Sequence, residues 1–495
     1  MKETLETLRN RIDEIDTQIA KLFAERMDAV EKIGIYKKDN ALGVNQAERE
    51  KSIVKRLTKL VPEEYAGAIE QVYDAIFATS KRYQSMVIGK AKFGLIGRNI
   101  NYSFSKEIHA AFADYDYSII NLEPEEVSGF FAKKEYSGYN VTIPYKRDAA
   151  ALCDELSPQA KAIGSVNTVV LRKDGTLFGD NTDYYGFLNM AEKAGVDFNG
   201  KKVLVFGNGA TSATICAAVK DKGGNITVIS RNGKTTYADL PQHKDAQILI
   251  NATPVGTFPE TENQITSIDQ FEQAEAVLDV VYTPLKSRFV QQGLERGLKA
   301  SGGLPMLVGQ AKKAAELFSG KEISKEDEER VYHKILRQKQ NLILIGMPGA
   351  GKTSLGKTAA EKLGRQFFDI DSEIEKRERM TIPEIFTKFG ESHFRAIETE
   401  VIAEITKTSG AVIATGGGAV MNRRNRLNIR QNGFCVLVRR DLSKLPLDGR
   451  PVSKAKGTKA LEKERMPVYK ELADAEIMNN GTFDQALAGI LEAFE

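Results

Sequence analysis

The sequence predicts a multidomain chain in which an all-helical N-terminal segment is followed by two α/β segments. Three observations support this prediction. Apolar residues recur with heptad-like spacing between Leu5 and Tyr36, as on one face of a long helix. A strand, a glycine-rich turn, a helix and a second strand are predicted between Lys202 and Arg231. An apolar run at Leu342–Ile345 enters a phosphate loop that opens a helix.

The composition is that of a globular protein with several domains. A length of 495 residues suggests about three of them. The net charge of +3 is too small to indicate a nucleic-acid partner. No apolar run approaches the roughly 20 residues of a membrane span, and the N-terminus carries a charged amphipathic helix instead of a signal peptide. Neither nucleic acid nor membrane is therefore expected as a partner.

The cysteines indicate a reducing compartment. Cys153, Cys216 and Cys435 are odd in number, far apart and surrounded by apolar residues. This pattern is typical of buried, reduced thiols and not of disulfides or a metal site. The expected location is therefore the cytoplasm.

The first segment, residues 1–88, is predicted to be helical. Apolar residues at positions 5, 8, 12, 15, 19 and 22 continue at 29, 33 and 36. A helix of this length spans roughly 50 Å, more than a small three-helix module can cover. We therefore expect two copies of the chain to share this helix as a homodimer. Two further helices are predicted at about 46–60 and 63–84.

One charged residue interrupts the apolar stripe. Arg26 occupies an apolar position, and a buried arginine requires an anion. Lys37 lies on the same face, about 20° round the helix. Arg9 lies about 100° away and roughly 25 Å along the axis, so it could reach a common ligand only from a partner chain. The alternative is a solvated charged face.

These residues resemble those of the all-helical chorismate mutases. The matching motifs are Leu8-Arg9, Ala24-Glu25-Arg26, Lys37, Glu48-Arg49-Glu50 and Ser80-x-x-x-Gln84. The resemblance implies an intertwined dimer that rearranges chorismate to prephenate, with Arg9 crossing over between chains. It implies that Arg26 and Arg49 hold the substrate carboxylates, that Lys37 and Gln84 hydrogen-bond the ether oxygen, and that Glu50 and Ser80 line the same site. Such a rearrangement needs a dicarboxylate held folded and charge stabilised on the breaking C–O bond.

The second segment, residues 89–335, contains a dinucleotide-binding pattern. The turn Gly207-Asn-Gly209-Ala210-Thr-Ser212 has serine where the usual fingerprint has its third Gly or Ala. The second strand ends at Arg231 instead of an acidic residue, and arginine suits a ribose 2′-phosphate. The pattern therefore favours NADP(H) over NAD. The alternative for Arg231 is an exposed charge at a strand end.

Other motifs of this segment resemble those of shikimate dehydrogenases. They are Ser103-Phe-Ser105, Asn140-Val-Thr142-Ile-Pro-Tyr-Lys146, Gly164-Ser-Val-Asn167-Thr168, Gly179-Asp-Asn-Thr-Asp183, Asn251-Ala-Thr253-Pro, Tyr282-Thr-Pro-Leu and Met306-Leu-Val-Gly-Gln310-Ala. The resemblance implies reduction of 3-dehydroshikimate to shikimate by NADPH. It divides the segment into a substrate domain (89–190), an NADP-binding domain (191–300) and C-terminal helices (301–335).

The same resemblance implies roles for particular residues. Lys146 would donate a proton to the carbonyl oxygen, and Asp183 would hold its charge and the adjacent hydroxyl. The implied substrate contacts are Ser103, Ser105, Thr142, Asn167, Tyr282 and Gln310. The implied cofactor contacts are Gly207, Gly209, Ala210, Arg231, Thr253, Gly303 and Met306. Without the resemblance, Lys146 and Asp183 would be interpreted as a surface ion pair. A quinate/shikimate dehydrogenase that uses NAD is the alternative within this fold, and Arg231 argues against it.

The third segment, residues 336–495, opens with the phosphate loop G-x-x-x-x-G-K-[ST]. Backbone N–H groups around Gly346, Gly349 and Gly351 are expected to surround the phosphates of ATP. Lys352 would reach the β/γ oxygens, and the hydroxyl of Thr353 would ligate Mg²⁺. The alternative is a glycine-rich surface turn. The loop alone does not identify the phosphoryl acceptor.

The rest of this segment resembles the shikimate kinases. The matching motifs are Phe367-Phe-Asp369-Ile-Asp371-Ser372, Gly390-Glu-Ser-His-Phe-Arg395-x-x-Glu398, Thr415-Gly416-Gly417-Gly418-Ala, Gly449-Arg450-Pro451 and Arg465-Met-Pro467-Val-Tyr469. The resemblance implies 3-phosphorylation of shikimate, with Asp369 supporting Mg²⁺ and Asp371 binding the reacting hydroxyl. It implies that Arg395 and Arg465 hold the carboxylate, that Gly416, Gly417 and Gly418 pack against the ring, and that Arg450 contacts the nucleotide. The lid is short, and Lys454 or Lys456 would replace its usual arginine. Ser372 and Glu375 also fit a helix capping box.

Together these motifs predict a trifunctional enzyme of aromatic amino-acid biosynthesis. The alternative is a bifunctional reductase and kinase whose helical segment only dimerises the chain or senses a ligand. The set of Arg9, Arg26, Lys37, Arg49 and Gln84 favours three activities, because a module that only dimerises has no use for a buried arginine. A generic nucleotide kinase or GTPase is disfavoured by Asp371, Arg395 and Arg465.

Overall fold

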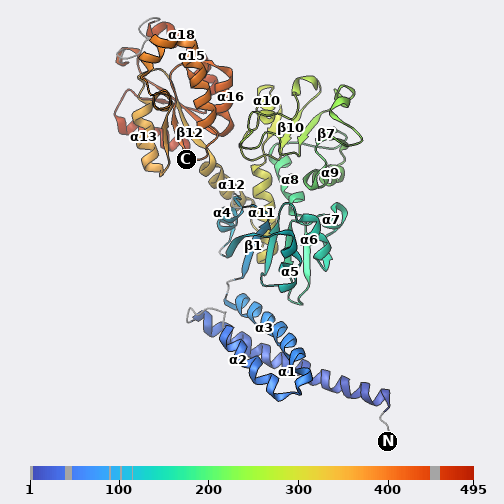
Figure 1. The fold of residues 1–495 in the computed structure, drawn as a ribbon. Coiled ribbons are helices and arrows are strands. Elements are labelled where there is room, and N and C mark those ends of the chain that lie inside the picture. The colour runs from blue at the N-terminus through green and yellow to red at the C-terminus, as the bar shows by residue number, and fades with distance from the viewer. Residues whose placement is uncertain (1–3, 40–46, 89–90, 101–102, 114, 446–456) are drawn as a thin grey trace. The chain divides into compact units, whose positions relative to one another are not determined.

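The N-terminal segment is helical, as predicted, in the computed structural model (Figure 1), which describes residues 4–39, 47–88, 91–100, 103–113, 115–445 and 457–495. Its helices are α1 (Leu5–Asp39), α2 (Ala47–Leu57) and α3 (Ala66–Ile88), with short 3₁₀ turns at Thr58–Leu60 and Glu63–Tyr65. The helix predicted at about 46–60 is present as α2 and the 3₁₀ turn that follows it, which ends at Leu60 because Val61 precedes a proline and adopts an extended conformation. None of the described helices is both long and apolar enough to cross a bilayer.

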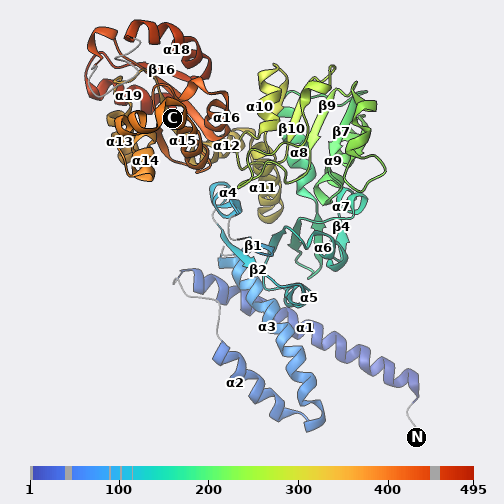
Figure 2. The same ribbon diagram turned by 45° about the horizontal axis from the view of Figure 1, so that its top comes forward.

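The apolar stripe of α1 is exposed within a single chain. The C-terminal half of α1 packs on α3, where Val30 and Phe77 are buried. The N-terminal half extends past α2 and α3 in both views (Figures 1 and 2). Large apolar side chains there are solvent-exposed, including Leu5 (65%), Ile12 (56%) and Leu22 (63%). The stripe residues of the C-terminal half are exposed as well, with Ile33 at 39% and Tyr36 at 63%. The three helices therefore bury a different face of α1 and leave the stripe uncovered.

The next part of the chain forms a mixed sheet with strand order β2-β1-β3-β5-β6-β4 among the described residues. The inner pairs β3–β5 and β5–β6 are antiparallel, while β1 is parallel to both of its neighbours. The strands are β1 (Lys92–Gly97), β2 (Asp116–Asn121), β3 (Gly138–Val141), β4 (Glu155–Leu156), β5 (Thr168–Leu171) and β6 (Leu177–Asp180). The helices between them are α4 (Ser105–Phe112), α5 (Pro124–Lys133), α6 (Lys146–Leu152) and α7 (Pro158–Ile163).

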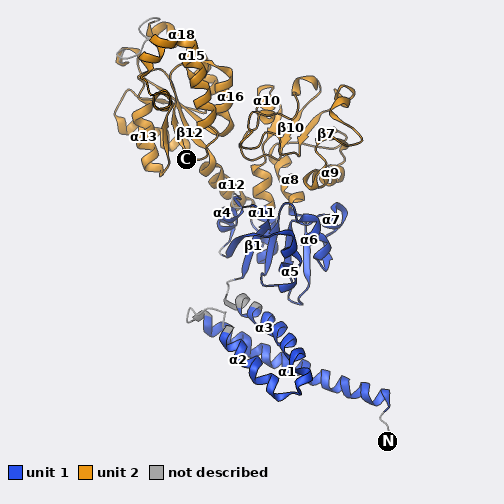
Figure 3. Cartoon of the chain, in the orientation of Figure 1, with its two compact units in different colours: residues 1–182, 311–323 blue, residues 183–310, 324–495 orange. Residues whose placement is uncertain are grey.

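The helical segment and this sheet belong to the first of two compact units (Figure 3). The first unit comprises residues 1–182 and 311–323, and the second comprises residues 183–310 and 324–495. The boundary between them passes through α8 (Thr182–Lys193) and α11 (Leu304–Ser319). The predicted division at residues 88/89 and 335/336 remains a prediction.

The first half of the second unit is a parallel sheet with strand order β11-β10-β9-β7-β8. Its strands are β7 (Lys202–Phe206), β8 (Asn225–Ile229), β9 (Ile248–Asn251), β10 (Ala276–Asp279) and β11 (Lys299–Ser301). Helices α9 (Ala210–Asp221) and α10 (Arg288–Glu295) and 3₁₀ turns at Tyr237–His243 and Ile268–Gln270 connect them. The predicted strand, turn, helix and strand are confirmed as β7, α9 and β8, although β8 ends two residues before Arg231.

The second half of this unit is another parallel sheet, with order β13-β14-β12-β15-β16. The strands are β12 (Asn341–Ile345), β13 (Phe367–Asp369), β14 (Val412–Ala414), β15 (Gly433–Arg439) and β16 (Ala475–Met478). The helices are α12 (Lys325–Lys339), α13 (Lys352–Leu363), α14 (Ile370–Glu378), α15 (Ile382–Ile405), α16 (Arg423–Asn432), α18 (Thr458–Leu472) and α19 (Phe483–Phe494), with 3₁₀ turns at Ala419–Met421 and Leu442–Lys444.

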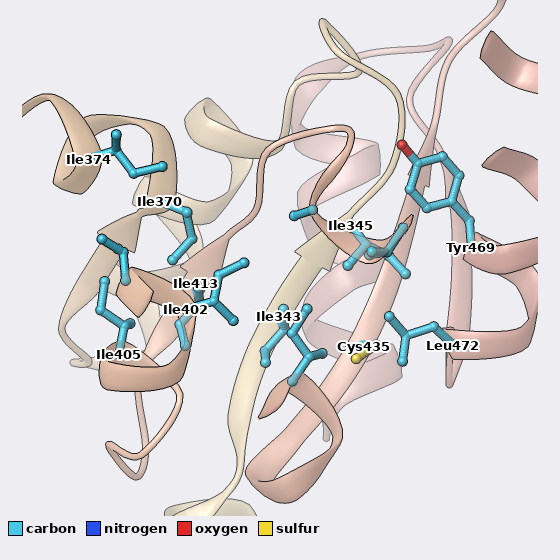
Figure 4. Close-up of a cluster of buried hydrophobic side chains, with 14 of the residues drawn as sticks. Ile343, Ile345, Ile370, Ile374, Ile402, Ile405, Ile413, Cys435, Tyr469 and Leu472 are labelled. Carbon is cyan, nitrogen blue, oxygen red and sulfur yellow. The ribbon is translucent and has the colours of Figure 1, made fainter. Parts of the chain in front are cut away.

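A core of branched aliphatic side chains fixes this sheet. Ile343 and Ile413, on neighbouring central strands, point toward Ile402 and Ile405 of α15, and all four are at most 8% exposed (Figure 4). β-Branched residues favour strands, and their burial on β12 makes it the rigid centre of the sheet. The phosphate loop follows directly from this strand, so its start is held in place.

The capping box predicted at Ser372 and Glu375 is wrong. Helix α14 begins earlier, because Asp369 serves as its N-cap residue and accepts a hydrogen bond from the Ser372 N–H at 3.2 Å. Asp is among the best N-cap residues, and here it competes successfully with Ser372. The Glu375 carboxylate instead accepts a hydrogen bond from the backbone of Ile382.

Candidate active sites

Four predicted polar residues of the helical segment meet between α1 and α3. The Arg26 guanidinium donates to the Ser80 hydroxyl at 2.5 Å, and the Lys37 ammonium donates to Gln84 Oε1 at 3.0 Å. Lys37, Ser80 and Gln84 are each less than 9% exposed. Arg26 is half-buried. A lysine is rarely covered to the extent of Lys37 unless it is paired or binds an anion.

Helix α2 adds two more charges to this cluster. Burial lowers the pKa of Lys37, the positive charge of Arg49 lowers it further, and the negative charge of Glu50 opposes them. The Glu50 carboxylate is paired with Lys81 at 3.1 Å. Arg26, Lys37 and Arg49 thus give the cluster an excess of positive charge, which suits a dianionic ligand.

Arg9 is not part of this cluster within one chain. It lies on the exposed N-terminal half of α1. Seventeen residues of helix separate it from Arg26, which corresponds to about 25 Å. Its predicted place in the site therefore requires a second copy of the chain.

In the first unit, predicted residues gather at the ends of β3 and β5. The Val141 N–H donates to the Asn167 carbonyl at 2.7 Å, and the Val166 N–H donates to the Lys146 carbonyl at 2.9 Å. These backbone bonds place Thr142, Lys146 and Asn167 beside one another. Lys146 is the first residue of α6.

The side-chain oxygen of Asn167 is engaged by its surroundings. Its Oδ1 accepts hydrogen bonds from the Thr182 N–H at 2.6 Å and from the Thr182 hydroxyl at 3.1 Å. Two other predicted residues form a separate pair, in which the Ser103 hydroxyl donates to the Ser105 hydroxyl at 3.0 Å. Ser105 begins α4, and its backbone N–H donates to the Ser103 hydroxyl at 3.2 Å.

In the second unit, Asp183 lies in the first turn of α8 and Gln310 lies on α11. These helices touch at Gly186, where a Cβ atom would lie 2.4 Å from the Met306 carbonyl. Gly303 is equally confined, because a Cβ there would lie 2.1 Å from the Val280 carbonyl. Lys146 belongs to the first unit and Asp183 to the second, so their pairing remains a prediction.

The glycine-rich turn after β7 is closed by the serine that departs from the fingerprint. Ser212 is 2% exposed, and its hydroxyl donates to the Gly207 carbonyl at 2.6 Å. Gly207 has φ of +116°, and a Cβ there would lie 3.0 Å from Thr253. Gly209 is the N-cap residue of α9, whose first N–H groups, starting at Ala210, face the turn. Arg231 is exposed beyond the end of β8.

A buried carboxylate, Asp279, joins the loops that follow β9 and β10. It accepts hydrogen bonds from the Ser287 hydroxyl at 2.5 Å, the Val281 N–H at 3.0 Å and Asn251 Nδ2 at 3.0 Å. Asn251 Oδ1 in turn accepts from the Thr253 hydroxyl at 2.7 Å. Asp279 therefore holds both the loop with Thr253 and the loop with Tyr282, which is half-buried.

Burial raises the pKa of Asp279 to about 7. A raised carboxyl pKa favours folding below the unfolded value near 4, and this contribution is lost as the pH rises through about 7. We expect the thermal midpoint of the parent, compared with that of Asp279→Asn, to fall as the pH increases from 5 to 8. Over the whole window between the unfolded and folded pKa values, the free energy of unfolding should fall by an amount on the order of 4 kcal/mol. A constant gap between the two midpoints across this range would contradict the prediction.

The phosphate loop has the conformation that its glycines predict. Gly346 has φ of +139°, and a Cβ there would lie 2.3 Å from the Val438 carbonyl. Gly349 and Gly351 also have positive φ. Lys352 is 7% exposed, and its ammonium donates to the carbonyls of Gly346 at 2.9 Å and Met347 at 3.0 Å.

The two predicted Mg²⁺ ligands lie next to each other beside this loop. The Thr353 hydroxyl donates to Asp369 Oδ2 at 2.6 Å. A hydroxyl and a carboxylate at the mouth of a phosphate loop are the hard oxygen donors that Mg²⁺ prefers. The residues present therefore fit this ion.

Residues predicted to bind the phosphoryl acceptor surround the glycines that follow β14. A Cβ at Gly416 would lie 2.8 Å from Asp371 Oδ1, and one at Gly418 would lie 2.6 Å from Arg395 Nη2. The Tyr469 hydroxyl donates to the Gly417 carbonyl. Arg465, one turn before Tyr469 on α18, is 5% exposed. Burial raises the pKa of Asp371, and the negative charge of Asp369 raises it further. Arg450, with Lys454 and Lys456, lies outside the described residues.

Glu398 is a residue of this cluster to which the sequence analysis assigned no role. It is 1% exposed, and its Oε2 accepts a hydrogen bond from Arg395 at 2.8 Å. A Cβ at Gly416 would lie 3.0 Å from its Oε1, which has no hydrogen-bond partner among the described residues. The i,i+3 spacing on a helix was the available signal. Glu398 fixes the plane of the Arg395 guanidinium.

Comparison with known families assigns each segment. Residues 8–85 match the family model of chorismate mutase type II, residues 95–169 that of the shikimate dehydrogenase substrate binding domain, and residues 348–495 that of shikimate kinase.

Curated relatives match the middle of the chain. The shikimate dehydrogenase (NADP(+)) of Clostridium perfringens is 35% identical over 265 residues, which are 49% of this chain and 97% of that protein. The corresponding enzyme of Clostridium beijerinckii is 33% identical over 247 residues, 46% of this chain and 91% of that protein. A crystal structure of a chorismate mutase/shikimate 5-dehydrogenase fusion protein from Clostridium acetobutylicum covers 50% of this chain and 97% of its own, with 28% identity and a TM-score of 0.47.

Proposed function

The chain belongs to the shikimate dehydrogenase family, and we propose that it catalyses three reactions of aromatic amino-acid biosynthesis. In order along the chain it contains a chorismate mutase domain, a shikimate dehydrogenase domain and a shikimate kinase domain. The observation that carries the proposal is that each domain holds its own compact polar cluster. Arg26 with Ser80, Lys146 beside Asn167, and Asp371 beside Gly416 mark these clusters. We propose domain limits of 1–88, 89–335 and 336–495.

The proposed dehydrogenase reaction reduces 3-dehydroshikimate to shikimate. NADPH, when bound at the turn after β7, supplies the hydride that adds to the carbonyl carbon. Lys146 gives a proton to the carbonyl oxygen, so that the C=O group becomes an alcohol. Asp183 stabilises the charge of Lys146 and binds the neighbouring hydroxyl. Arg231, exposed after β8, pairs with the 2′-phosphate that distinguishes NADP(H) from NAD.

The proposed kinase reaction transfers the terminal phosphoryl group of ATP to the 3-hydroxyl of shikimate. Asp371 binds that hydroxyl, and its raised pKa suits a group that accepts a proton. Arg395, oriented by Glu398, and Arg465 bind the carboxylate. Lys352 stabilises charge on the transferred group, and Mg²⁺ held by Thr353 and Asp369 would add to this effect.

The proposed mutase reaction requires no proton transfer. Arg26 and Arg49 hold the two carboxylates of chorismate, and Lys37 with Gln84 binds the ether oxygen as its bond breaks. The site is completed by Arg9 from a second copy, so the functional form is a homodimer. The exposed stripe of α1 supports this proposal, because its apolar area stays in water within a single chain. We propose the cytoplasm as its location.

We expect Arg26→Ala to slow the rearrangement of chorismate by about 10²-fold, because an unpaired buried carboxylate costs roughly 2–5 kcal/mol. The matched control is Arg11→Ala, an exposed residue on the same helix. The measurement is the decrease in chorismate concentration with the full chain. If the parent does not convert chorismate while dehydrogenase and kinase assays are positive, the helical domain is a dimerisation or sensing module.

The same variants test whether the site is shared between chains. Arg9→Ala and Arg26→Ala are expected to be inactive separately. In a refolded equimolar mixture, half of the dimers are mixed and each has one intact site, so about a quarter of the parent activity should return. Activity that stays at the level of the single variants would mean that Arg9 and Arg26 act within one chain.

A further inference from the structure

Helix α16 of the kinase domain contacts the nucleotide-binding sheet of the dehydrogenase through residues that the reactions above do not use. Both elements belong to the second compact unit. The contact is made with α10 and with the loop between β10 and α10. Buried polar groups form this contact together with surface charges, and none of these groups has a role in the proposed reactions.

The loop before α10 satisfies the end of α16. The Lys286 N–H donates to the Gln431 carbonyl at 2.9 Å, and the Leu285 N–H donates to Asn432 Oδ1 at 2.9 Å. The last carbonyls of a helix have no partner within the helix, and loop N–H groups must also find acceptors. Each element therefore supplies the partner that the other lacks.

The middle of the contact is a buried pair. Arg288 on α10 donates to Asn428 Oδ1 on α16, and these residues are 8% and 1% exposed. Gln291, one turn further along α10, is 3% exposed. Arg288 Nη1 and Gln291 Oε1 have no protein partner among the described residues.

Ion pairs enclose the other end of α16. Arg424 donates to both carboxylate oxygens of Glu262, at 3.1 and 2.7 Å, and Arg423 donates to Glu295 at 2.9 Å. The pKa of Glu262 is lowered mainly by its hydrogen bond with Arg424. Exposed pairs of this kind add little energy, but Arg423 with Glu295 fixes the register of α16 on α10, and Arg424 with Glu262 joins α16 to the loop after β9.

The contact also lies between two predicted substrate-binding elements. Tyr282 belongs to the loop that Asp279 holds at one end and α16 holds at the other. On the kinase side, α16 follows the glycine triplet at Gly416–Gly418 through a single 3₁₀ turn. Movement at the contact would therefore change both loops.

We propose that α16 is a built docking surface that joins the kinase domain to the nucleotide-binding sheet as one cooperative body and orders the loop bearing Tyr282. Its occupant is the segment Leu285–Arg288 with the adjoining face of α10. The part that concerns Tyr282 rests on the proposed dehydrogenase function, whereas the docking itself does not.

The test uses the full chain in calorimetry with NADP⁺ and ADP as probes. In the parent, the two sheets should unfold in one transition that ADP shifts as a whole. Asn428→Leu removes the hydrogen-bond partner of buried Arg288 and leaves it only the longer ion pair with Glu262 at 4.0 Å, so the transition should split and its first component should fall by about 5 °C. Two transitions in the parent, each answering to one nucleotide, would overturn the proposal.

The double variant Arg288→Met with Asn428→Leu gives the sharper outcome. Replacing both members of a buried pair by apolar groups of similar shape is nearly neutral, so the single transition should return. Arg430→Met is the matched control, because Arg430 lies on α16 but pairs with Glu471 inside the kinase domain. A double variant as split as Asn428→Leu alone would also overturn the proposal.

Kinetics separate this proposal from the proposed function. Asn428→Leu should weaken the apparent affinity of the dehydrogenase for its carbonyl substrate several-fold, seen as a higher KM with little change in turnover, and the double variant should restore it. If the parent lacks dehydrogenase activity but still shows one ADP-shifted transition, the docking is supported and the dehydrogenase assignment fails.

Discussion

Asp371→Asn is expected to slow the turnover of shikimate phosphorylation by about 10³-fold. Asn keeps the shape and a hydrogen bond to the hydroxyl, but it cannot accept the proton or carry the negative charge. In the parent, burial and the charge of Asp369 raise the pKa of Asp371. As the pH is lowered, the rate of the parent should therefore begin to fall at a higher pH than it would with an ordinary aspartate. The residual rate of the variant should not show this fall.

The chain supplies the controls for this experiment. Glu373→Gln removes an acid from the same helix that pairs with Lys376 at the surface, and it should leave phosphorylation unchanged. Dehydrogenase and mutase activities measured on the same Asp371→Asn sample report whether the chain is folded. A turnover rate within tenfold of the parent would remove Asp371 from the mechanism.

Lys146→Met should slow the turnover of the dehydrogenase reaction by about 10²- to 10⁴-fold. Methionine keeps the length of the aliphatic stem but has no proton to give. The proposed NADPH site lies in the second unit, and Lys146 lies in the first, so the affinity for NADPH should be unchanged. The measurements are steady-state kinetics and a fluorescence titration with NADPH.

Arg147→Met is the matched substitution, since Arg147 is the exposed neighbour of Lys146 on the same helix. It should retain the turnover rate of the parent. If both variants lose activity equally, the effect comes from the loss of positive charge at the start of α6 and not from proton donation.

The elements that follow strong local patterns could be predicted from the sequence. The strand before the phosphate loop, its glycines and the helix after it form a local unit, because Gly346 and Gly351 need positive φ. The long helix and the β7–α9–β8 unit were equally clear. The predicted start of α14 was wrong because both Asp369 and Ser372 are residues that can cap a helix. The choice of Asp369 depends on the packing of the strand that it ends.

Sites assembled from distant residues were predicted through motifs and not through periodicity. The pairs Arg26 with Ser80 and Arg395 with Glu398 lie at positions that the motifs named, although no role was assigned to Glu398. No pattern in the sequence predicted the contact of α16 with α10. Its residues, such as Asn428 and Gln291, are polar and would be read as solvated surface. Burial of such residues depends on which surfaces meet, and one sequence does not contain that information.

Because the N-terminal half of α1 is uncovered, its helical structure should depend on the concentration of the protein. A helix stretch without tertiary support is marginal in water, even when its residues favour helix. Below the dissociation constant of the proposed dimer, the amides of residues 5–22 should exchange with deuterium much faster than those near Val30, which is buried. The dehydrogenase and kinase domains should show no such dependence. The exchange rate of the N-terminal helix would thus depend on the concentration of the protein, while the structure of the other two domains would not.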